Sequence, residues 1–290
     1  MSILVISFPE TKTLAMKVAR GLRAEYETIS SKDFPDGELN VSLKKNPKNK
    51  EVVVISSMAK QPNKRIIETI LAGGIAKDYG AKKVILFATY FPYMRQDRHF
   101  LKYDSFSSKY VSRLFFLFDK IITIAPHRHR IKNLKTLAKN LDYIEVNSLI
   151  SAYIKKRFGS NLTVVGPDEE SSQWSRPIAE ALGKKAIVLK KHRYSPSRIR
   201  DEKTDAKFGR NVIVIDDIIS TGKTMVGALE LAKKKGAKNL VALGVHGVFD
   251  EDSVKQIQKH ATLITTNTVP SRFSKIDVSP AIIKELKKIL

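Results

Sequence analysis

The chain repeats itself at a spacing of nearly 160 residues, and this repeat limits the possible fold more than any other feature. Each of four matching pairs joins a segment of the first half to one of the second half: residues 6–10 with 164–169, 18–22 with 178–182, 51–57 with 211–217, and 77–91 with 233–247. The last pair aligns KDYGAKKVILFATYF with KKKGAKNLVALGVHG. Several matches at nearly one spacing predict two copies of a single folding unit.

Within each copy, short apolar runs alternate with longer segments of helical spacing. Runs rich in Val and Ile are too short for helices and are typical of buried strands: residues 3–7, 51–57, 83–90, 120–126, 162–167, 186–190, 211–217, 239–245 and 262–265. Helices are expected over residues 63–79, 171–182 and 222–235. This alternation predicts an α/β fold in which each copy has a mainly parallel sheet flanked by helices.

The repeat also predicts the domain organisation. We expect an N-terminal domain over residues 1–145, a C-terminal domain over residues 146–278, and a C-terminal helix over residues 279–290. Ser279 is a good cap for that helix, and Pro280 fits its first turn. The sequence leaves open which half this helix packs against.

Composition excludes several classes of protein. The 290 residues include no cysteine, which rules out disulfides and thiolate metal sites. No run of about 18 apolar residues is present, so a membrane-spanning helix is not expected. The opening MSILVISFPETKT has no basic leader and is expected to form a first strand rather than a signal peptide. These features favour a cytoplasmic protein without membrane partners.

The charge is strongly unbalanced, with 52 Lys and Arg against 29 Asp and Glu, a net charge of +23. Such an excess attracts polyanions, either nucleic acid or a phosphorylated small molecule, although a lysine-rich solvated surface explains it as well. Lysine is spread along the chain, and no basic segment is interleaved with aromatic residues as in single-strand readers. The sequence therefore does not favour nucleic acid as a partner.

Residues 212–224, VIVIDDIISTGKT, end in the Gly-Lys-Thr of a nucleotide-binding P-loop. A P-loop needs a second glycine five positions before Gly222, and Asp217 stands there instead. A carboxylate at that position would face the phosphates that the loop should hold. The segment is therefore not expected to be a P-loop.

The same segment fits a sugar phosphate better. Asp216 and Asp217 end an apolar strand, and their carboxylates can accept hydrogen bonds from sugar hydroxyls. The turn after them offers backbone N–H groups, hydroxyls and a helix N-terminus, which suit a phosphate monoester. It consists of Ser220, Thr221, Gly222, Lys223 and Thr224. A ribose 5-phosphate pocket is the interpretation; a capped helix with exposed acids is the structural alternative.

Five further segments carry candidate binding residues, and each has a plain structural alternative. DFPDGELN (33–40) is expected to form a β-turn or hairpin tip. YFPYMRQDRHF (90–100) and IAPHRHR (124–130) follow strands, where ligands of α/β proteins bind, but they also fit a solvated basic loop and structural histidines. VVGPDEESSQ (164–173) fits a helix cap. LKKHRYSPSRIR (189–200) fits a basic lid or a generic loop.

Together these motifs resemble the ribose-phosphate pyrophosphokinase family, which has two domains of the type I phosphoribosyltransferase fold, and the resemblance covers essentially the whole chain. It implies transfer of the β,γ-pyrophosphoryl group of ATP to the 1-hydroxyl of ribose 5-phosphate, giving phosphoribosyl pyrophosphate and AMP. It also implies Mg²⁺ as the cofactor and a homo-oligomer with the ATP site near a subunit interface.

The resemblance also implies a role for each matching residue. Those implied to bind ATP are Phe34, Asp36 and Glu38, supplied to an adjacent subunit, with Arg95, Gln96, Arg98 and His99. Those implied to bind ribose 5-phosphate are Asp216, Asp217, Ser220, Thr221, Gly222, Lys223 and Thr224. The implied metal contacts are His127 and Asp168, and the implied catalytic cations are Lys191, with Lys190 as the neighbouring alternative, and Arg193.

Two other classes of protein explain parts of the sequence. A phosphoribosyltransferase that consumes phosphoribosyl pyrophosphate would account for residues 212–224 but not for the duplication, the RQDRH motif or the FPDGE motif. A nucleic-acid-binding module would account for the net charge only. A regulatory homologue without activity is disfavoured because Lys191 and Arg193 are retained.

Overall fold

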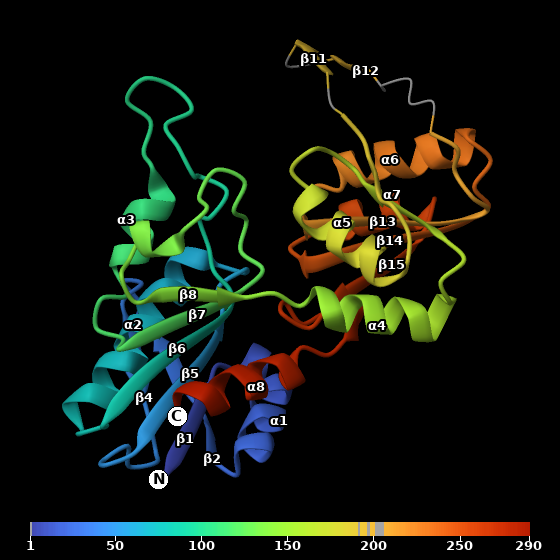
Figure 1. Ribbon diagram of the computed structural model, residues 1–290. Helices are drawn as coiled ribbons and strands as arrows, with labels where there is room; N and C mark the ends of the chain where they lie inside the picture. The colour runs from blue at the N-terminus through green and yellow to red at the C-terminus, as the bar shows by residue number, and fades with distance from the viewer. Residues whose placement is uncertain (1, 191, 196–197, 201–205) are drawn as a thin grey trace. The chain divides into compact units, whose positions relative to one another are not determined.

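The computed structural model describes residues 2–190, 192–195, 198–200 and 206–290. The chain divides into two compact units, which are described separately below. Unit 1 comprises Met1–Ile144 together with Val278–Leu290, and unit 2 comprises Glu145–Asp277 (Figure 1). Among the described helices, none has the length and hydropathy needed to cross a membrane.

Unit 1 is built on a parallel sheet with the strand order β2-β1-β5-β6-β7-β8. The strands are β1 Ile3–Ser7, β2 Glu25–Thr28, β5 Glu51–Ser57, β6 Lys83–Tyr90, β7 Lys120–Ile124 and β8 Leu141–Ile144. Its helices are α1 Lys12–Leu22, α2 Pro62–Asp78, α3 Ser107–Arg113 and α8 Ser279–Ile289, with short 3₁₀ turns at Pro9–Thr11 and Leu134–Thr136. A separate hairpin pairs β3 Ser30–Asp33 with β4 Leu39–Ser42.

Unit 2 has a second parallel sheet with the strand order β10-β9-β13-β14-β15-β16. The strands are β9 Thr163–Gly166, β10 Ile187–Val188, β13 Asn211–Ile219, β14 Asn239–Gly247, β15 Thr262–Thr266 and β16 Ser274–Ile276. Its helices are α4 Asn147–Phe158, α5 Ser172–Ala181, α6 Lys223–Lys234 and α7 Glu251–Gln258. A short antiparallel pair joins β11 His192–Ser195 to β12 Arg198–Arg200.

The two sheets share one topology, which confirms the predicted duplicated α/β fold. In chain order within each unit, the second strand lies at one edge, beside the first, and the remaining strands follow on the other side. Because the strands are parallel, their carboxyl ends meet along one edge of each sheet. Ligands of such sheets bind at that edge, above all where the strand order reverses, which here is between β1 and β5 and between β9 and β13.

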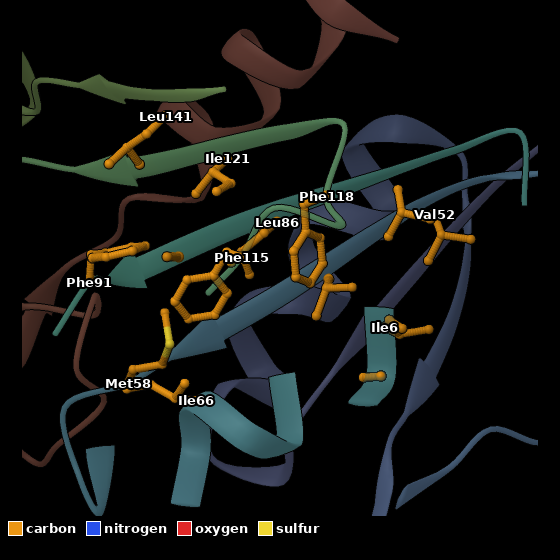
Figure 2. Packing of buried hydrophobic residues seen from close by; sticks show 14 of the residues in the cluster. Ile6, Val52, Met58, Ile66, Leu86, Phe91, Phe115, Phe118, Ile121 and Leu141 are labelled. Atoms are coloured by element: carbon orange, nitrogen blue, oxygen red, sulfur yellow. The ribbon is translucent and has the colours of Figure 1, made fainter. Parts of the chain in front are cut away.

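The core of unit 1 forms because its central strands are apolar on both faces. Val52, Val54 and Leu86 are fully buried and belong to one cluster with Phe115 and Phe118. Figure 2 shows this packing between the sheet and its covering segments. Full burial of each aromatic ring stabilises the fold by about 1.5–3 kcal/mol. The rigid sheet therefore supplies a fixed base for the loops at its carboxyl edge.

The C-terminal helix α8 belongs to unit 1, which answers the question that the sequence left open. It lies against α1 (Figure 1). A Cβ atom on Gly21 of α1 would come within 2.4 Å of Ile283 of α8, so glycine is needed for this close approach. Lys83 Nζ also donates a 2.5 Å hydrogen bond to the carbonyl oxygen of Ile289.

Two elements differ from their predicted form. The strand expected over residues 186–190 contains only Ile187–Val188, because β10 is an edge strand that pairs with β9 alone. The basic segment expected as a loop includes the paired strands β11 and β12. The expected hairpin tip at residues 33–40 is confirmed, since β3 and β4 pair from Asp33 with Leu39.

Candidate active site

The acidic residues of unit 2 lie at the reversal point of its sheet. β9 and β13 are neighbours, with Val165 opposite Val214, and both continue toward the carboxyl edge. Asp168 follows β9, while Asp216 and Asp217 lie within the last residues of β13. Three carboxylates from two adjacent strands are therefore brought together at the edge where ligands of this fold class bind.

Asp216 carries the strongest electrostatic signature of the site. Its pKa is raised well above the ordinary aspartate value, first by burial of the carboxyl group and then by the negative charges of Asp217 and Asp168. The backbone N–H of Asp217 donates to Asp216 Oδ1 at 3.0 Å, and the N–H of Ile218 donates to Asp217 Oδ1 at 2.7 Å. A cluster of this kind stabilises positive charge or hydrogen-bond donors brought by a ligand.

Asp168 is held by the turn that begins α5. The backbone N–H of Ser171 donates to Asp168 Oδ1 at 3.1 Å, and the Ser171 hydroxyl donates to the Asp168 carbonyl oxygen at 2.5 Å. Asp168 therefore holds the turn before α5, whereas the cap residue itself, Ser171, makes no side-chain capping hydrogen bond. The Asp168 carboxylate is also close enough to raise the pKa of Asp216. Asp168 therefore both holds this turn and adds negative charge to the site.

Residues 220–224 turn the chain from β13 into α6. Gly222 is the cap of α6 and has a φ of 71°, in the left-handed region that favours glycine. A Cβ atom there would lie 3.1 Å from Ile257 Cδ1. Ser220 and Thr224 are partly exposed, and Thr221 and Lys223 are exposed, so an anion can approach this helix start from solvent.

The acidic residues of unit 2 are possible ligands of a divalent cation. Among the described residues, no group of three or more His, Cys, Asp or Glu has the arrangement of a metal site. Mg²⁺ is commonly bound through one or two carboxylates, waters and substrate phosphates instead. The cluster of Asp216, Asp217 and Asp168 fits that mode, because burial and then the two neighbouring negative charges raise the pKa of Asp216, and a cation would offset both effects.

In unit 1, the hairpin tip presents its side chains to solvent. The N–H of Phe34 donates to the carbonyl oxygen of Glu38 at 2.8 Å, and Gly37, with a φ of 91°, closes the turn. Phe34 is 48% exposed, and Asp36 and Glu38 are exposed beside it. Beside the tip, a groove of about 560 Å³ runs along α2 and includes Ile67 among its lining residues.

The excursion between β6 and α3 carries the next group of predicted residues, and it extends away from the sheet (Figure 1). Arg95, Gln96, Arg98 and His99 are all exposed. The Ser107 hydroxyl donates to Gln96 Oε1 at 2.5 Å. This bond uses the amide oxygen of Gln96 as an acceptor. His99 Nδ1 bonds the carbonyl oxygen of Asp104, so the ring is folded back onto its own loop.

The loop after β7 turns sharply at Ala125, whose φ of 37° is left-handed for a residue other than glycine. His127 follows and is buried, with 8% of its surface exposed. The guanidinium of Arg128 lies 4.0 Å from the centre of the Tyr143 ring. Arg130 Nη1 donates to Asp97 Oδ1 at 3.1 Å and to Oδ2 at 3.3 Å, which joins this loop to the one after β6.

The predicted site residues thus form three groups. Unit 2 brings Asp168, Asp216, Asp217 and the 220–224 turn to one edge. In unit 1, the loop of residues 95–99 is bonded to the loop that carries His127, and the hairpin tip with Phe34, Asp36 and Glu38 is a separate element. His127 and Asp168 belong to different units.

The predicted catalytic cations are only partly within the described structure. Lys191 lies outside the described residues. The backbone of Arg193 is in β11, opposite Ile199 of β12.

Two residues with structural importance were missed by sequence reasoning. Asp97 and Arg130 form the bond between the two loops of unit 1, and no role was assigned to either from the sequence. A signal was present, because Asp97 is a lone acid between Arg95 and Arg98 in an otherwise basic segment. An acid in such a segment needs a cationic partner when its side chain is buried.

Comparison with known proteins agrees with this architecture. The family model described as the N-terminal domain of ribose phosphate pyrophosphokinase matches residues 3–117, and that of the phosphoribosyl transferase domain matches residues 133–277. The ribose-phosphate pyrophosphokinase of Pyrococcus abyssi is 30% identical over 288 residues, covering 98% of each chain. That of Thermococcus kodakarensis is 32% identical over 91% of this chain and 94% of its own.

A solved structure shows the same fold at the level of the whole chain. Phosphoribosylpyrophosphate synthetase from Mycobacterium smegmatis superimposes with a TM-score of 0.86, covering 100% of this chain and 99% of that chain at 22% identity. The matches in sequence extend over both units and both sets of loops described above. The chain therefore belongs to the ribose-phosphate pyrophosphokinase family of enzymes.

Proposed function

We propose that this enzyme transfers the β,γ-pyrophosphoryl group of ATP to the 1-hydroxyl of ribose 5-phosphate, with Mg²⁺, through the residues described above. The observation that supports this most is the pairing of an acidic cluster with an anion-binding turn on one strand end. Asp216 and Asp217 precede Ser220 and Gly222 by only a few residues, so diol acceptors and a phosphate cradle lie on the same segment.

Ribose 5-phosphate binds at the carboxyl edge of unit 2 in this proposal. Asp216 and Asp217 accept hydrogen bonds from the ribose hydroxyls or hold a cation on them. Ser220, Thr221, Gly222, Lys223 and Thr224 hold the 5-phosphate through backbone N–H groups, hydroxyls and the start of α6. The acidic cluster and the 220–224 turn also fix the orientation of ribose 5-phosphate in this proposal. In the reverse orientation its phosphate would lie beside three carboxylates and would be repelled.

ATP binds through unit 1. Phe34 stacks on the adenine, and Asp36 and Glu38 accept hydrogen bonds from the base. Arg95, Gln96 and Arg98 contact the nucleotide, and His99 lies in the same loop. Arginine and amide donors suit phosphate oxygens and ring nitrogens, and each of these side chains is exposed. His127 is the residue of unit 1 that would contact Mg²⁺, and Asp168 is the proposed metal contact within the acidic cluster of unit 2.

Little covalent work is needed from the protein in this transfer. O1 of the sugar releases its proton to solvent and bonds to the β-phosphorus, while the bond from that phosphorus to the oxygen bridging the α-phosphate breaks. AMP leaves with that oxygen. Bound Mg²⁺ supplies charge neutralisation on the phosphates, and Lys191 and Arg193 stabilise the charge that develops on the transferred group. Positioning of the two substrates is the remaining contribution.

The hairpin tip also supports a homo-oligomer in this proposal. Phe34 is 48% exposed and Ile67 is 49% exposed; Ile67 lines the groove along α2, together with Gly37 and Glu38 of the hairpin tip that carries Phe34. Exposed apolar side chains beside a groove are typical of contact surfaces between subunits. Phe34, Asp36 and Glu38 then reach the nucleotide of an adjacent copy. A cytoplasmic location stays a prediction from composition.

A coupled assay of AMP formation tests the proposed reaction. Purified enzyme with Mg²⁺ and ATP is expected to release AMP only when ribose 5-phosphate is present, and removal of Mg²⁺ by a chelator is expected to stop the release. AMP formation without the sugar phosphate, or none with it, would contradict the proposal. Size-exclusion chromatography with light scattering tests the oligomer, for which a monomer at assay concentration is the opposing result.

A further inference from the structure

The bond between Asp97 and Arg130 connects two loops that the sheet itself does not hold together. The parallel pairing of β6 with β7 ends at Ala88 and Thr123. Beyond that point the loops of residues 91–106 and 125–133 separate from the ladder. Arg130 Nη1 donates to both carboxylate oxygens of Asp97, at 3.1 and 3.3 Å.

The burial of this pair makes it a strong constraint. The Asp97 side chain is 0% exposed and the Arg130 side chain is 32% exposed. A carboxylate removed from water is strongly destabilising unless a cation and donors compensate it, so either loop moving away would strand a buried charge. The pair is therefore stable only when the two loops keep their relative positions.

The loop of residues 91–106 is also held by hydrogen bonds to α3. The backbone N–H of Ser108 donates to the Gln96 carbonyl oxygen at 3.2 Å, and the Ser107 hydroxyl donates to Gln96 Oε1 at 2.5 Å. With Asp97 turned into the protein, the neighbouring side chains of Arg95, Gln96 and Arg98 are exposed. Bonds on both sides thus determine which face of the loop these groups present.

We propose that Asp97 and Arg130 are positioning residues for ATP. Their ion pair holds the loop with Arg95 and Gln96 and the loop with His127 as one unit, so that all three groups approach the nucleotide together. This inference rests on the proposed roles of Arg95, Gln96 and His127. Neither Asp97 nor Arg130 needs to touch the substrate for this effect.

A double-mutant cycle on ATP kinetics tests the proposal. Asp97→Asn and Arg130→Gln are each expected to raise the KM for ATP about tenfold, with the KM for ribose 5-phosphate changed less than about twofold. Because both act through one bond, the double variant is expected to be no worse than the poorer single variant. Arg130→Lys, which keeps the charge, should restore part of the ATP affinity.

Amide hydrogen exchange gives a readout that does not depend on activity. Asp97→Asn is expected to speed exchange in the peptide covering residues 126–131, which carries no substitution, as well as in residues 93–100. Lys120→Gln is the matched control, since it breaks the ion pair with Asp142 between β7 and β8 and should change neither loop.

Additive effects on the ATP KM in the double variant would overturn the proposal, as would unchanged exchange at residues 126–131 in Asp97→Asn. Inactivity of the unsubstituted enzyme would instead contradict the proposed function, and the exchange result would still decide whether the two loops are coupled. Melting temperatures of all variants separate loss of the pair from loss of the fold.

Discussion

The backbone N–H of Asp217 donates a hydrogen bond to the side chain of Asp216 at 3.0 Å, so two consecutive acids share one strand end. Alternation along a strand would normally place such neighbours on opposite faces. Here Asp216 is half-buried and Asp217 is buried, and the charges of Asp217 and Asp168 act on Asp216. Negative charge is thus concentrated at this strand end, and hydrogen-bond donors or a cation placed there would stabilise it.

This concentration of negative charge predicts that the substitution Asp216→Asn stabilises the free enzyme. A raised pKa means that the folded state binds the proton more tightly than the unfolded chain does, so ionisation of Asp216 costs stability. The cost is absent below the unfolded pKa of about 3.9 and grows as pH rises through the folded pKa. Asp216→Asn should therefore melt at a higher temperature than the unsubstituted enzyme at neutral pH, with the difference vanishing near pH 4.

Asp250→Asn is the control, because it is expected to change the melting temperature in the opposite direction. Asp250 caps α7 by accepting from the Ser253 N–H at 2.8 Å, and this bond lowers its pKa. Its contribution is present above the unfolded pKa and is lost as pH falls through the folded one. Asp250→Asn should thus lower the melting temperature at neutral pH. A destabilised Asp216→Asn would refute this account of the site.

Truncation of Phe34 should affect nucleotide binding without affecting the fold. The ring is 48% exposed at a hairpin tip, so Phe34→Ala is expected to change the free energy of unfolding by less than about 0.5 kcal/mol. Loss of stacking on the adenine should raise the KM for ATP by roughly tenfold, since such stacking is worth about 1–3 kcal/mol. Steady-state kinetics with ATP as the varied substrate measures this.

Tyr79→Ala is a suitable comparison for Phe34→Ala. Tyr79 follows α2 and is 67% exposed, yet it lies outside the hairpin. Its loss should leave the KM for ATP unchanged. Equal effects of the two substitutions would argue against a role of Phe34 at the base.

How well the sequence predicted the fold depended on how buried each element is. The central strands β5, β6 and β13 are apolar and buried, and their apolar runs predicted their positions to within a few residues. Three of the strands that were not predicted, β2, β8 and β16, have sequences EYET, LDYI and SKI and lie at edges of the two large sheets. A strand with one solvated side does not need an apolar run, so hydrophobicity alone cannot reveal it.

The proximity of candidate site residues was predictable where they are local in sequence. Asp216 and the 220–224 turn are within one segment, so spacing alone placed them together, and their joint role stays a prediction. Asp168 was assigned through family resemblance, and only the structure shows its charge acting on Asp216. The Asp97–Arg130 bond joins residues 33 positions apart, and no local pattern encodes such a contact.

Catalytic charge in the 189–200 segment should come from one lysine. Lys191→Ala is expected to lower kcat by about 10²–10³, the usual effect of losing one group that stabilises transition-state charge, with modest change in the KM for ribose 5-phosphate. Lys190→Ala is the matched variant and should keep most of the turnover. If Lys190→Ala loses turnover and Lys191→Ala keeps it, the catalytic role belongs to Lys190. Unchanged turnover in both variants would remove the catalytic role from this segment.

Alanine substitutions at two glycines near the start of α6 test whether this turn binds the sugar phosphate. Gly222 has a φ of 71°, which costs an alanine about 1–2 kcal/mol, and the added Cβ would lie 3.1 Å from Ile257. Gly222→Ala should thus destabilise the enzyme and raise the KM for ribose 5-phosphate, because the turn that holds the 5-phosphate is distorted.

Gly227 lies within α6 with open space around it, so Gly227→Ala should stabilise the helix by about 0.5–1 kcal/mol and leave both KM values unchanged. Denaturant unfolding and steady-state kinetics on both variants measure these effects, and an unchanged KM for ribose 5-phosphate in Gly222→Ala would remove this turn from the sugar-phosphate site.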